Sequence, residues 1–332
     1  MAPAKRTNPR QERGAALLTV LLLVAVIAVL AATALEKLRL STRLAANLIA
    51  IDQARGYAMA AETLAVTRID TLLGRDAARV TLVGGWSGQP FRLPVPGGMA
   101  TAIVTDGGNC FNLNGLVVEN GPNSYTPRIG AIAQFTRLMQ IIGIPEQTGG
   151  GIAAATADWI DSDSTPLPNG AEDGQYSGGE IGYSTANTLI GDISELRAIA
   201  GVTPQIYAKL RPWVCAQPVA EQSRINVNTL LPEQAPLFAM LAPDRLSVEA
   251  ARAMLLDRPP QGYTSTVAFW KVAALKGVTP FPEQEAQTAI TTKWFALHID
   301  VELGGTELTQ TALIDATTRP ARLVARAWGD PA

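Results

Sequence analysis

The longest apolar pattern in the chain lies near its N-terminus. From Ala15 to Leu35 the sequence has 21 residues without a charged side chain. As an α-helix this run is about 31 Å long, which matches the hydrocarbon core of a bilayer. Beyond it, apolar residues recur at helical intervals without an intervening proline, at Leu40, Leu44, Leu48, Ile51, Ala58, Ala65 and Ile69. The pattern predicts one helix of about 90 Å from Ala15 to about Leu73, whose second half packs on a globular head.

Alternating apolar and polar positions predict two groups of strands, one directly after the helix and one near the C-terminus. In residues 293–303, every second side chain from Phe295 to Leu303 is apolar, which is typical of a strand with one buried face. The predicted strands are residues 90–95, 99–106, 293–303, 307–316 and 321–328. Together they predict an antiparallel sheet with a three-strand meander near the C-terminus.

Residues 112–290, between the two groups of strands, have mostly helical and loop character and contain a repeat. The motif CFNLNGL, with Asn112 and Asn114, returns 114 residues later as RINVNTL, with Asn226 and Asn228. We therefore expect two related helical modules.

A second motif, Gly-Val-Thr-Pro, also occurs twice, but its copies at Gly201 and Gly277 are only 76 residues apart. The difference of 38 residues indicates an insertion in the first module. In each copy the glycine is expected to end one helix. Thr203 or Thr279 would then cap the next helix, with proline at its first position.

The charge of the body argues against nucleic acid as a partner. The 332-residue chain has a net charge of −2; residues 1–14 hold four of its 27 basic and one of its 29 acidic residues, so the remainder carries −5. Nucleic-acid-binding domains instead gather lysine and arginine on one face. The Gly-Val-Thr-Pro turns are similar to helix-hairpin-helix modules of DNA-binding proteins, but in the first copy the nearest cations are Lys209 and Arg211. We expect no nucleic-acid contact.

The two cysteines, Cys110 and Cys215, form neither a zinc-ligand pattern nor a CxxC redox motif. If the body lies beyond the cytoplasmic membrane, a disulfide between them is expected, and it would close a loop of about 105 residues. The alternative is two separate buried thiols.

The N-terminal segment allows three interpretations. A secretory signal peptide could be cleaved after Ala32-Thr33-Ala34, leaving a soluble product that begins at Leu35, but the apolar run exceeds the roughly 7–15 residues of such signals. A retained anchor is the second interpretation, and the net positive flank KRTNPRQER favours a cytoplasmic N-terminus for it. The third is a helix that serves first in lipid and later in a protein assembly.

The leader resembles that of type IV prepilins, because it ends in Gly14 and Ala15 opens the apolar helix. In that family a prepilin peptidase cleaves between these two positions, the new N-terminus is methylated, and the helix is kept as an anchor that later enters a fibre. The resemblance therefore favours the third interpretation.

The fifth position after the cleavage bond departs from most of that family. Pilins and pseudopilins usually carry a glutamate there, which pairs with the N-terminal amine of the subunit above, whereas this chain has Thr19. Threonine brings no charge into the hydrocarbon, and its hydroxyl can bond the carbonyl of Ala15. A missing glutamate is typical of the K-type minor pseudopilins of type II secretion (general secretion pathway protein K), which are thought to sit at the fibre tip.

The whole chain is similar to this K family, in which a large helical domain interrupts a pilin-like head. The resemblance implies an α+β fold with a long N-terminal helix on an antiparallel sheet and an insert of two sterile-alpha-motif-like (SAM-like) modules. The implied parts are a cleaved leader (1–14), a transmembrane helix (15–73), a β head (74–111 and 291–332) and an α-domain (112–290, with modules of about 112–215 and 224–290).

The resemblance also implies a structural protein with a single pass through the bacterial inner membrane and its C-terminal body in the periplasm. The protein would initiate and cap the fibre that drives export across the outer membrane. Its implied partners are the I- and J-type minor pseudopilins of a tip complex, the major pseudopilin fibre, the prepilin peptidase and the inner-membrane assembly platform. The alternatives are a large minor pilin of a type IV pilus and a competence pseudopilin that binds DNA through helix-hairpin-helix modules.

The insertion in the first module contains an acidic loop, ADWIDSDSTPLPNGAEDGQYSGGE, which has no positive charge. Its acidic residues are Asp158, Asp161, Asp163, Glu172, Asp173 and Glu180. Repulsion among so many carboxylates is relieved by water or by a cation, and Ca²⁺ accepts six to eight oxygens in loose geometry. A solvated loop without a cation remains the alternative.

The segment lacks the glycine of an EF-hand, but it resembles the DWID…GAED segment of the K family, where calcium is bound. We expect Asp161, Asp163, Glu172 and Asp173 as ligands, with Asp158 as a further candidate or a structural residue.

Sequence signals of an enzyme are absent. His298, the only histidine, lies on the polar face of a predicted strand, and the chain has no GxSxG, Walker A or HExxH motif. We therefore expect no catalytic activity.

Overall fold

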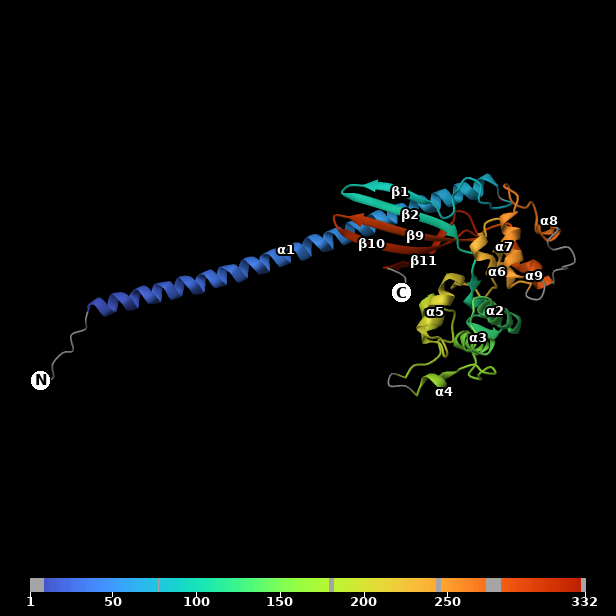
Figure 1. Cartoon of the computed structure of the whole chain (residues 1–332), viewed down its shortest axis with the longest axis horizontal. Coiled ribbons are helices and arrows are strands. Elements are labelled where there is room, and N and C mark those ends of the chain that lie inside the picture. The colour runs from blue at the N-terminus through green and yellow to red at the C-terminus, as the bar shows by residue number, and fades with distance from the viewer. Residues whose placement is uncertain (1–8, 77, 179–181, 243–245, 273–281, 330–332) are drawn as a thin grey trace.

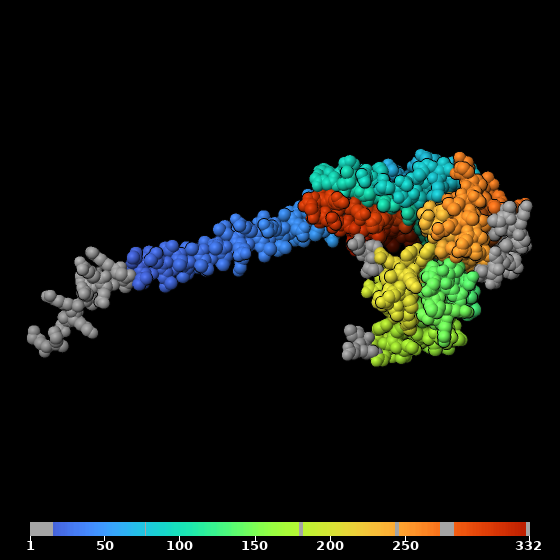
Figure 2. All heavy atoms as spheres, viewed as in Figure 1, coloured from blue at the N-terminus to red at the C-terminus, as the bar shows by residue number. Residues whose placement is uncertain are grey.

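The computed structural model describes residues 9–76, 78–178, 182–242, 246–272 and 282–329. One long helix leads into a head built on a β-sheet, and a helical insert lies at the end of the head farthest from the N-terminus (Figure 1). The space-filling view shows the same arrangement, with the helix projecting alone from the head (Figure 2). This arrangement confirms the α+β fold expected from the sequence.

Helix α1 (Pro9–Arg75) has 67 residues and is therefore about 100 Å long. It begins earlier than predicted, because the residues before Ala15 continue the helix. From Ala16 to Ile49 its side chains are exposed, and it is long and apolar enough to cross a membrane. The predicted packing face is only partly correct, because Leu40, Leu44 and Leu48 are exposed. The buried face begins at Ala54 and continues through Ala58, Ala61, Ala65, Ile69 and Leu73.

The head contains a five-stranded antiparallel sheet that packs on this buried face. Its strand order is β1-β2-β9-β10-β11. The bounds are Pro90–Val95 (β1), Gly98–Asp106 (β2), Trp294–Leu303 (β9), Thr306–Asp315 (β10) and Arg322–Trp328 (β11). Strand β2 pairs directly with β9, from Gly98 opposite Leu303 to Asp106 opposite Phe295, although the insert separates them in sequence. The predicted split sheet and its C-terminal meander are therefore confirmed.

A buried carboxylate fixes the helix to the sheet. Glu62 of α1, only 7% exposed, accepts hydrogen bonds from the guanidinium of Arg326 at 2.7 and 2.8 Å and from the amide of Gln310. Since a buried charge is costly without a partner, these bonds define one position of α1 along the sheet.

The insert has its own hydrophobic core and consists of short helices with small strand pairs. Its first part contains β3 (Phe111–Asn112), β4 (Val117–Gly121), β5 (Ser124–Pro127), α2 (Ile129–Ile141), α3 (Glu146–Ile160), α4 (Asp173–Tyr176), α5 (Pro204–Leu210) and β6 (Val214–Cys215). Its second part contains β7 (Ile225–Asn226), α6 (Ala235–Ala239), α7 (Val248–Leu256), α8 (Thr266–Trp270), α9 (Pro282–Gln287) and β8 (Thr288–Ala289). Four short 3₁₀ helices are described between them: Leu113–Leu116, Ile193–Ala198, Arg211–Trp213 and Pro232–Gln234.

The Gly-Val-Thr-Pro motif of the first module has the predicted conformation. Gly201 adopts a left-handed φ of +84° after the helical turns of Ile193–Ala198. Thr203 then caps α5 by accepting a hydrogen bond from Ile206 N at 3.3 Å, with Pro204 as the first helical residue. The second copy, which includes Gly277 and Thr279, lies outside the described residues.

Candidate functional sites: the exposed helix and the acidic loop

The predicted cleavage bond, Gly14–Ala15, lies within the backbone of α1 at the start of the exposed apolar segment. One turn further, the Thr19 hydroxyl donates a hydrogen bond to the carbonyl oxygen of Ala16 at 2.8 Å. The expected acceptor, Ala15, is therefore wrong by one residue, because the threonine side chain reaches the carbonyl three residues back. The hydroxyl is satisfied within its own helix and needs no partner from another subunit.

Asp158, at the end of α3, organises the acidic loop through backbone amides. Its carboxylate accepts hydrogen bonds from Leu167 N at 3.2 Å and from Ala171 N at 2.7 Å, and the side chain is fully buried. A Cβ at Gly170 would collide with Asp158 Oδ2, so the loop closes this tightly only with glycine there. Of the two roles considered for Asp158, these contacts support the structural one.

Three carboxylates converge in the same loop. Oxygens of Asp161, Asp163 and Glu172 lie within 4.8 Å of one another, and Asp161 and Glu172 are buried while Asp163 is exposed. Burial and the negative charge of Asp163 raise the pKa of Asp161 to about 7. The pKa of Glu172 is also raised, first by burial and then by the charge of Asp158. The negative charges of Asp163 and Glu172 therefore both act against ionisation of Asp161.

The chemistry of these donors fits a hard divalent cation. Asp161 Oδ2 and Glu172 Oε1 are buried and accept no hydrogen bond from any residue in the described ranges. A buried carboxylate oxygen without a donor is costly, and a cation would relieve both the missing bonds and the repulsion. The ligand set itself stays a prediction.

Asp173, the fourth expected ligand, has a different partner. Its Oδ1 accepts hydrogen bonds from both the backbone N and the hydroxyl of Thr185, each at 2.8 Å, and these bonds lower its pKa. Asp173 therefore follows Glu172 in the chain, but its carboxylate is not part of the three-carboxylate cluster. Glu180, the last acidic residue of the loop, lies outside the described residues.

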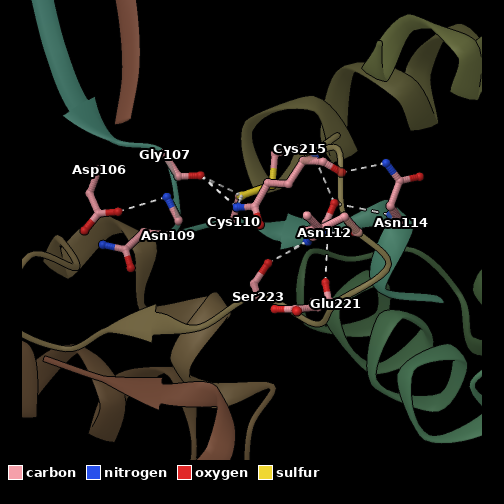
Figure 3. The surroundings of a disulfide bond; sticks show 12 residues. Asp106, Gly107, Asn109, Cys110, Asn112, Asn114, Cys215, Glu221 and Ser223 are labelled. Atoms are coloured by element: carbon pink, nitrogen blue, oxygen red, sulfur yellow. Dashed lines mark hydrogen bonds between the residues drawn. A yellow bond between two sulfur atoms is a disulfide. The ribbon is translucent and has the colours of Figure 1, made fainter. Parts of the chain in front are cut away.

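The disulfide between Cys110 and Cys215 is present, with a Cα–Cα distance of 5.8 Å (Figure 3). It joins the entry of the first module, directly after the head, to the exit of that module at β6. Its neighbour Asn112 accepts a hydrogen bond from Gln217 N at 2.9 Å and donates to Glu221 O at 2.8 Å, so the two ends of the module meet at this point.

The repeated asparagines have matching positions in the two modules. Asn114 accepts from Ile190 N and donates to Ile190 O, and Asn228 accepts from Tyr263 N and donates to Tyr263 O. In both modules the first asparagine also accepts a hydrogen bond from the backbone N of the second, at 3.3 and 2.9 Å. The repeat noted in the sequence is thus a side-chain clamp on a distant backbone segment, a role that the spacing alone did not indicate.

The surface role expected for His298 agrees with the structure. Its side chain is 41% exposed, and its Nε2 lies 3.1 Å from Asp300 Oδ2 on the same face of β9.

Comparison with known families gives a consistent result. The family model described as "Type II secretion system (T2SS), protein K" matches in two parts, over residues 109–219 and 225–293. Each matched part contains one pair of the repeated asparagines.

Curated relatives cover nearly the whole chain. A type II secretion system protein K from Klebsiella pneumoniae is 36% identical over 330 residues, covering 96% of this chain and 97% of the relative. The protein of that name from Pectobacterium carotovorum subsp. carotovorum is 33% identical over 326 residues, covering 96% and 97%.

Among solved structures, the chain is similar to one from a crystal structure of the GspK-GspI-GspJ complex of the enterotoxigenic Escherichia coli type 2 secretion system. The TM-score is 0.73 and the identity 28%, with 84% of this chain and 96% of that chain covered.

Proposed function

The chain belongs to the type II secretion system protein K family, and we propose that it forms the tip of the pseudopilus and starts its assembly. It is a minor pseudopilin, a membrane-anchored protein with a periplasmic body. In the proposed pathway, prepilin peptidase cleaves the chain after Gly14 at the inner membrane, the new N-terminus at Ala15 is methylated, and α1 later moves from the bilayer into the fibre.

The observation that carries the tip position is the chemistry of the exposed helix. From Ala15 to Leu35 it has no acidic side chain, and Thr19 satisfies its own hydroxyl within α1. A subunit of this kind brings no charge that calls for the N-terminal amine of a subunit above it, so it can be the first member of a fibre.

The position of the insert supports the same proposal. The insert covers the end of the head that lies farthest from the membrane segment (Figures 1 and 2). A further subunit above this one would have to stack on the insert rather than on a pilin-like head, so growth would continue only from below.

The partners proposed for the tip are the I- and J-type minor pseudopilins, since the structural relative comes from a GspK-GspI-GspJ complex. The finished tip would then be continuous with the major pseudopilin fibre and would contact the assembly platform of the inner membrane.

We further propose that Ca²⁺ binds to the cluster of Asp161, Asp163 and Glu172. Two buried, unpaired carboxylate oxygens in this cluster support the proposal. The cation would hold the acidic loop against α3, and its role would be structural and not catalytic.

Co-expression of the full-length chain with the I- and J-type subunits of the same organism tests the tip proposal. Affinity purification through a tag on the chain should recover both subunits in one complex extracted from membranes. Deletion of the chain should abolish the initiation of pseudopilus assembly. Recovery of neither subunit, or pseudopili of normal number without the chain, would contradict it.

A further inference from the structure

A cavity of about 260 Å³ lies between α1, the first two strands and the loop at residues 81–89. Its walls include Ile69 and Leu72 of α1, Phe91 of β1, Val104 of β2 and Trp86 of the loop. The Trp86 indole is held in place by its hydrogen bond to Thr81 O at 2.7 Å and by contact with the Phe295 ring, 5.5 Å away between centroids. The cavity therefore has a mostly apolar lining whose largest side chain is fixed.

Arg68 is the one charged side chain in this lining. Its guanidinium carbon lies over the Phe91 ring, 3.6 Å from the ring centroid, so the group is held against the apolar wall. Within the described ranges, Arg68 has no ion pair and no hydrogen bond. A stacked guanidinium directs its N–H donors outward along its plane, in the geometry that a carboxylate binds.

The size and place of the cavity indicate the kind of occupant. At about 260 Å³ it is smaller than the roughly 300–1,000 Å³ of most small-molecule sites, and it suits a single side chain. Ile69 lies 34 residues beyond Leu35, which is about 50 Å along the helix, so membrane lipid does not reach it. One turn before Arg68, Leu64 is 40% exposed, so apolar surface continues from the cavity along α1 toward its exposed half.

We propose that this cavity, the Arg68 pocket, receives an apolar side chain of an adjacent pseudopilin together with a carboxylate beside it. The apolar group fills the space between Trp86 and Phe91, and the carboxylate pairs with the guanidinium of Arg68. The inference rests on the proposed function, because it requires a neighbouring subunit along α1.

Photo-crosslinking in cells tests the pocket directly. The photoreactive residue p-benzoylphenylalanine replaces Gln89, at the polar part of the lining, in the full-length chain expressed with the complete secretion system. We expect a crosslink to another pseudopilin, and mass spectrometry should find the crosslinked site within a few residues of an aspartate or glutamate.

Charge reversal supplies the matched comparison. Arg68→Glu should lower the crosslink yield about tenfold, since it replaces attraction by repulsion at the same place. Arg92→Glu makes the same change in charge on an exposed, adjacent position of β1, and its yield should stay within about twofold of the parent. Replacing the partner's acidic residue by arginine should restore the yield of the Arg68→Glu variant.

Filling the cavity gives an independent variant. Val104→Phe places a ring where the partner side chain would lie, and it should reduce the crosslink while Arg68 is intact. Arg68 is exposed, so Arg68→Glu decides the question if the Val104 variant fails to fold.

A crosslink that is unchanged in Arg68→Glu, one that forms only with lipid or exported protein, or no crosslink at all would overturn the pocket. If the chain still recovers the I- and J-type subunits in that case, only the pocket is wrong. If it recovers neither, the proposed function fails as well.

Discussion

The two modules of the insert share one backbone clamp but are closed by different chemistry. In the first, Asn112 lies opposite Cys215 in a parallel strand pair, and in the second, Asn226 lies opposite Ala289. The residue two positions before each asparagine is Cys110 in the first module and Arg224 in the second. Only the first module can therefore be closed by a covalent bond at this point.

The second module is instead bound to the head. Asn226 donates to Val80 O at 3.1 Å and to the Thr292 hydroxyl at 2.8 Å, and Thr229 donates to the carboxylate of Asp106 at the end of β2. Asn112, by contrast, bonds residues of its own module and the segment that leaves it. The comparison shows how one duplicated unit can serve as a stable extension and as a connector to the sheet.

Removal of the disulfide should produce the largest difference in stability between the two modules. Cys110→Ser with Cys215→Ser should destabilise the first module by about 3–5 kcal/mol, because the bridge closes a long loop of 105 residues. Hydrogen exchange on the full-length protein in lipid nanodiscs would report each module separately. Equal loss of protection in both modules would contradict independent closure.

Removal of the clamps comes next. Asn114→Ala should cost the first module about 2–4 kcal/mol, since it leaves the buried N–H and C=O of Ile190 without partners. Asn228→Ala should act on the second module through Tyr263. Asn120→Ala is the control, because the exposed side chain of Asn120 bonds only the Thr126 hydroxyl among the described residues. Equal loss of hydrogen-exchange protection in both modules, in either the Asn114 or the Asn228 variant, would contradict separate clamps.

Calcium should stabilise the first module alone. At a concentration 100 times the dissociation constant, binding would add about 2.7 kcal/mol, and EGTA should remove this gain. Asp161→Asn should abolish the response. Asp173→Asn separates the two roles considered for Asp173: a retained response fits its bonds to Thr185, and a lost response makes it a ligand. An EGTA effect that persists in Asp161→Asn would place the ion elsewhere.

A second disulfide would make the modules more alike. Arg224→Cys with Ala289→Cys occupies the positions that correspond to Cys110 and Cys215, and we expect the bridge to form and to stabilise the second module by about 1–2 kcal/mol. The gain should be smaller than the loss in the first module, because the hydrogen bonds to the head already restrict this end. Thiol titration and hydrogen exchange check both points.

The smallest effect should come from Asp106, which links the second module to the head. Burial raises the pKa of Asp106, although hydrogen bonds from Thr229 and Thr292 act to lower it. Its contribution to stability is therefore full at low pH and is lost as pH rises through the raised pKa. Asp106→Asn should flatten this part of the pH dependence and change stability at pH 7 by less than about 1 kcal/mol. A steeper fall of stability with rising pH in the variant would contradict the sign.

Asp315 of the head is a control for Asp106, because its contribution to stability should depend on pH in the opposite direction. Burial acts to raise the pKa of Asp315, but hydrogen bonds from Thr317 and the Arg322 guanidinium outweigh it and lower the pKa. Its contribution is present at neutral pH and is lost as pH falls, so Asp315→Asn should reduce stability at pH 7.

Much of the fold could be predicted because its signals are local. The alternation in residues 293–303 reports a strand with one buried face, and the Thr203-Pro204 sequence reports a helix start. The duplicated asparagine motif indicated two modules, since both copies solve the same packing problem. The buried face of α1 was harder to predict: Leu44 and Ala58 follow the same helical period, and only the reach of the sheet decides which is covered.

The candidate site was predictable in composition but not in geometry. Charge density identified the acidic loop, yet the sequence alone could not separate Asp158, which binds backbone amides, from Asp161 and Glu172, whose oxygens remain unpaired. Nor could it show that Glu62 and Arg326 pair across 264 residues, because such contacts depend on how distant elements pack.

The central claim is that the apolar helix is kept in the mature subunit. Intact-mass spectrometry of the protein isolated from membranes of cells with an active prepilin peptidase tests it most directly. We predict a chain that begins at Ala15 and carries one added methyl group. A mature chain that begins at Leu35 would mean that the helix is discarded, and it would contradict a place for this protein in the fibre.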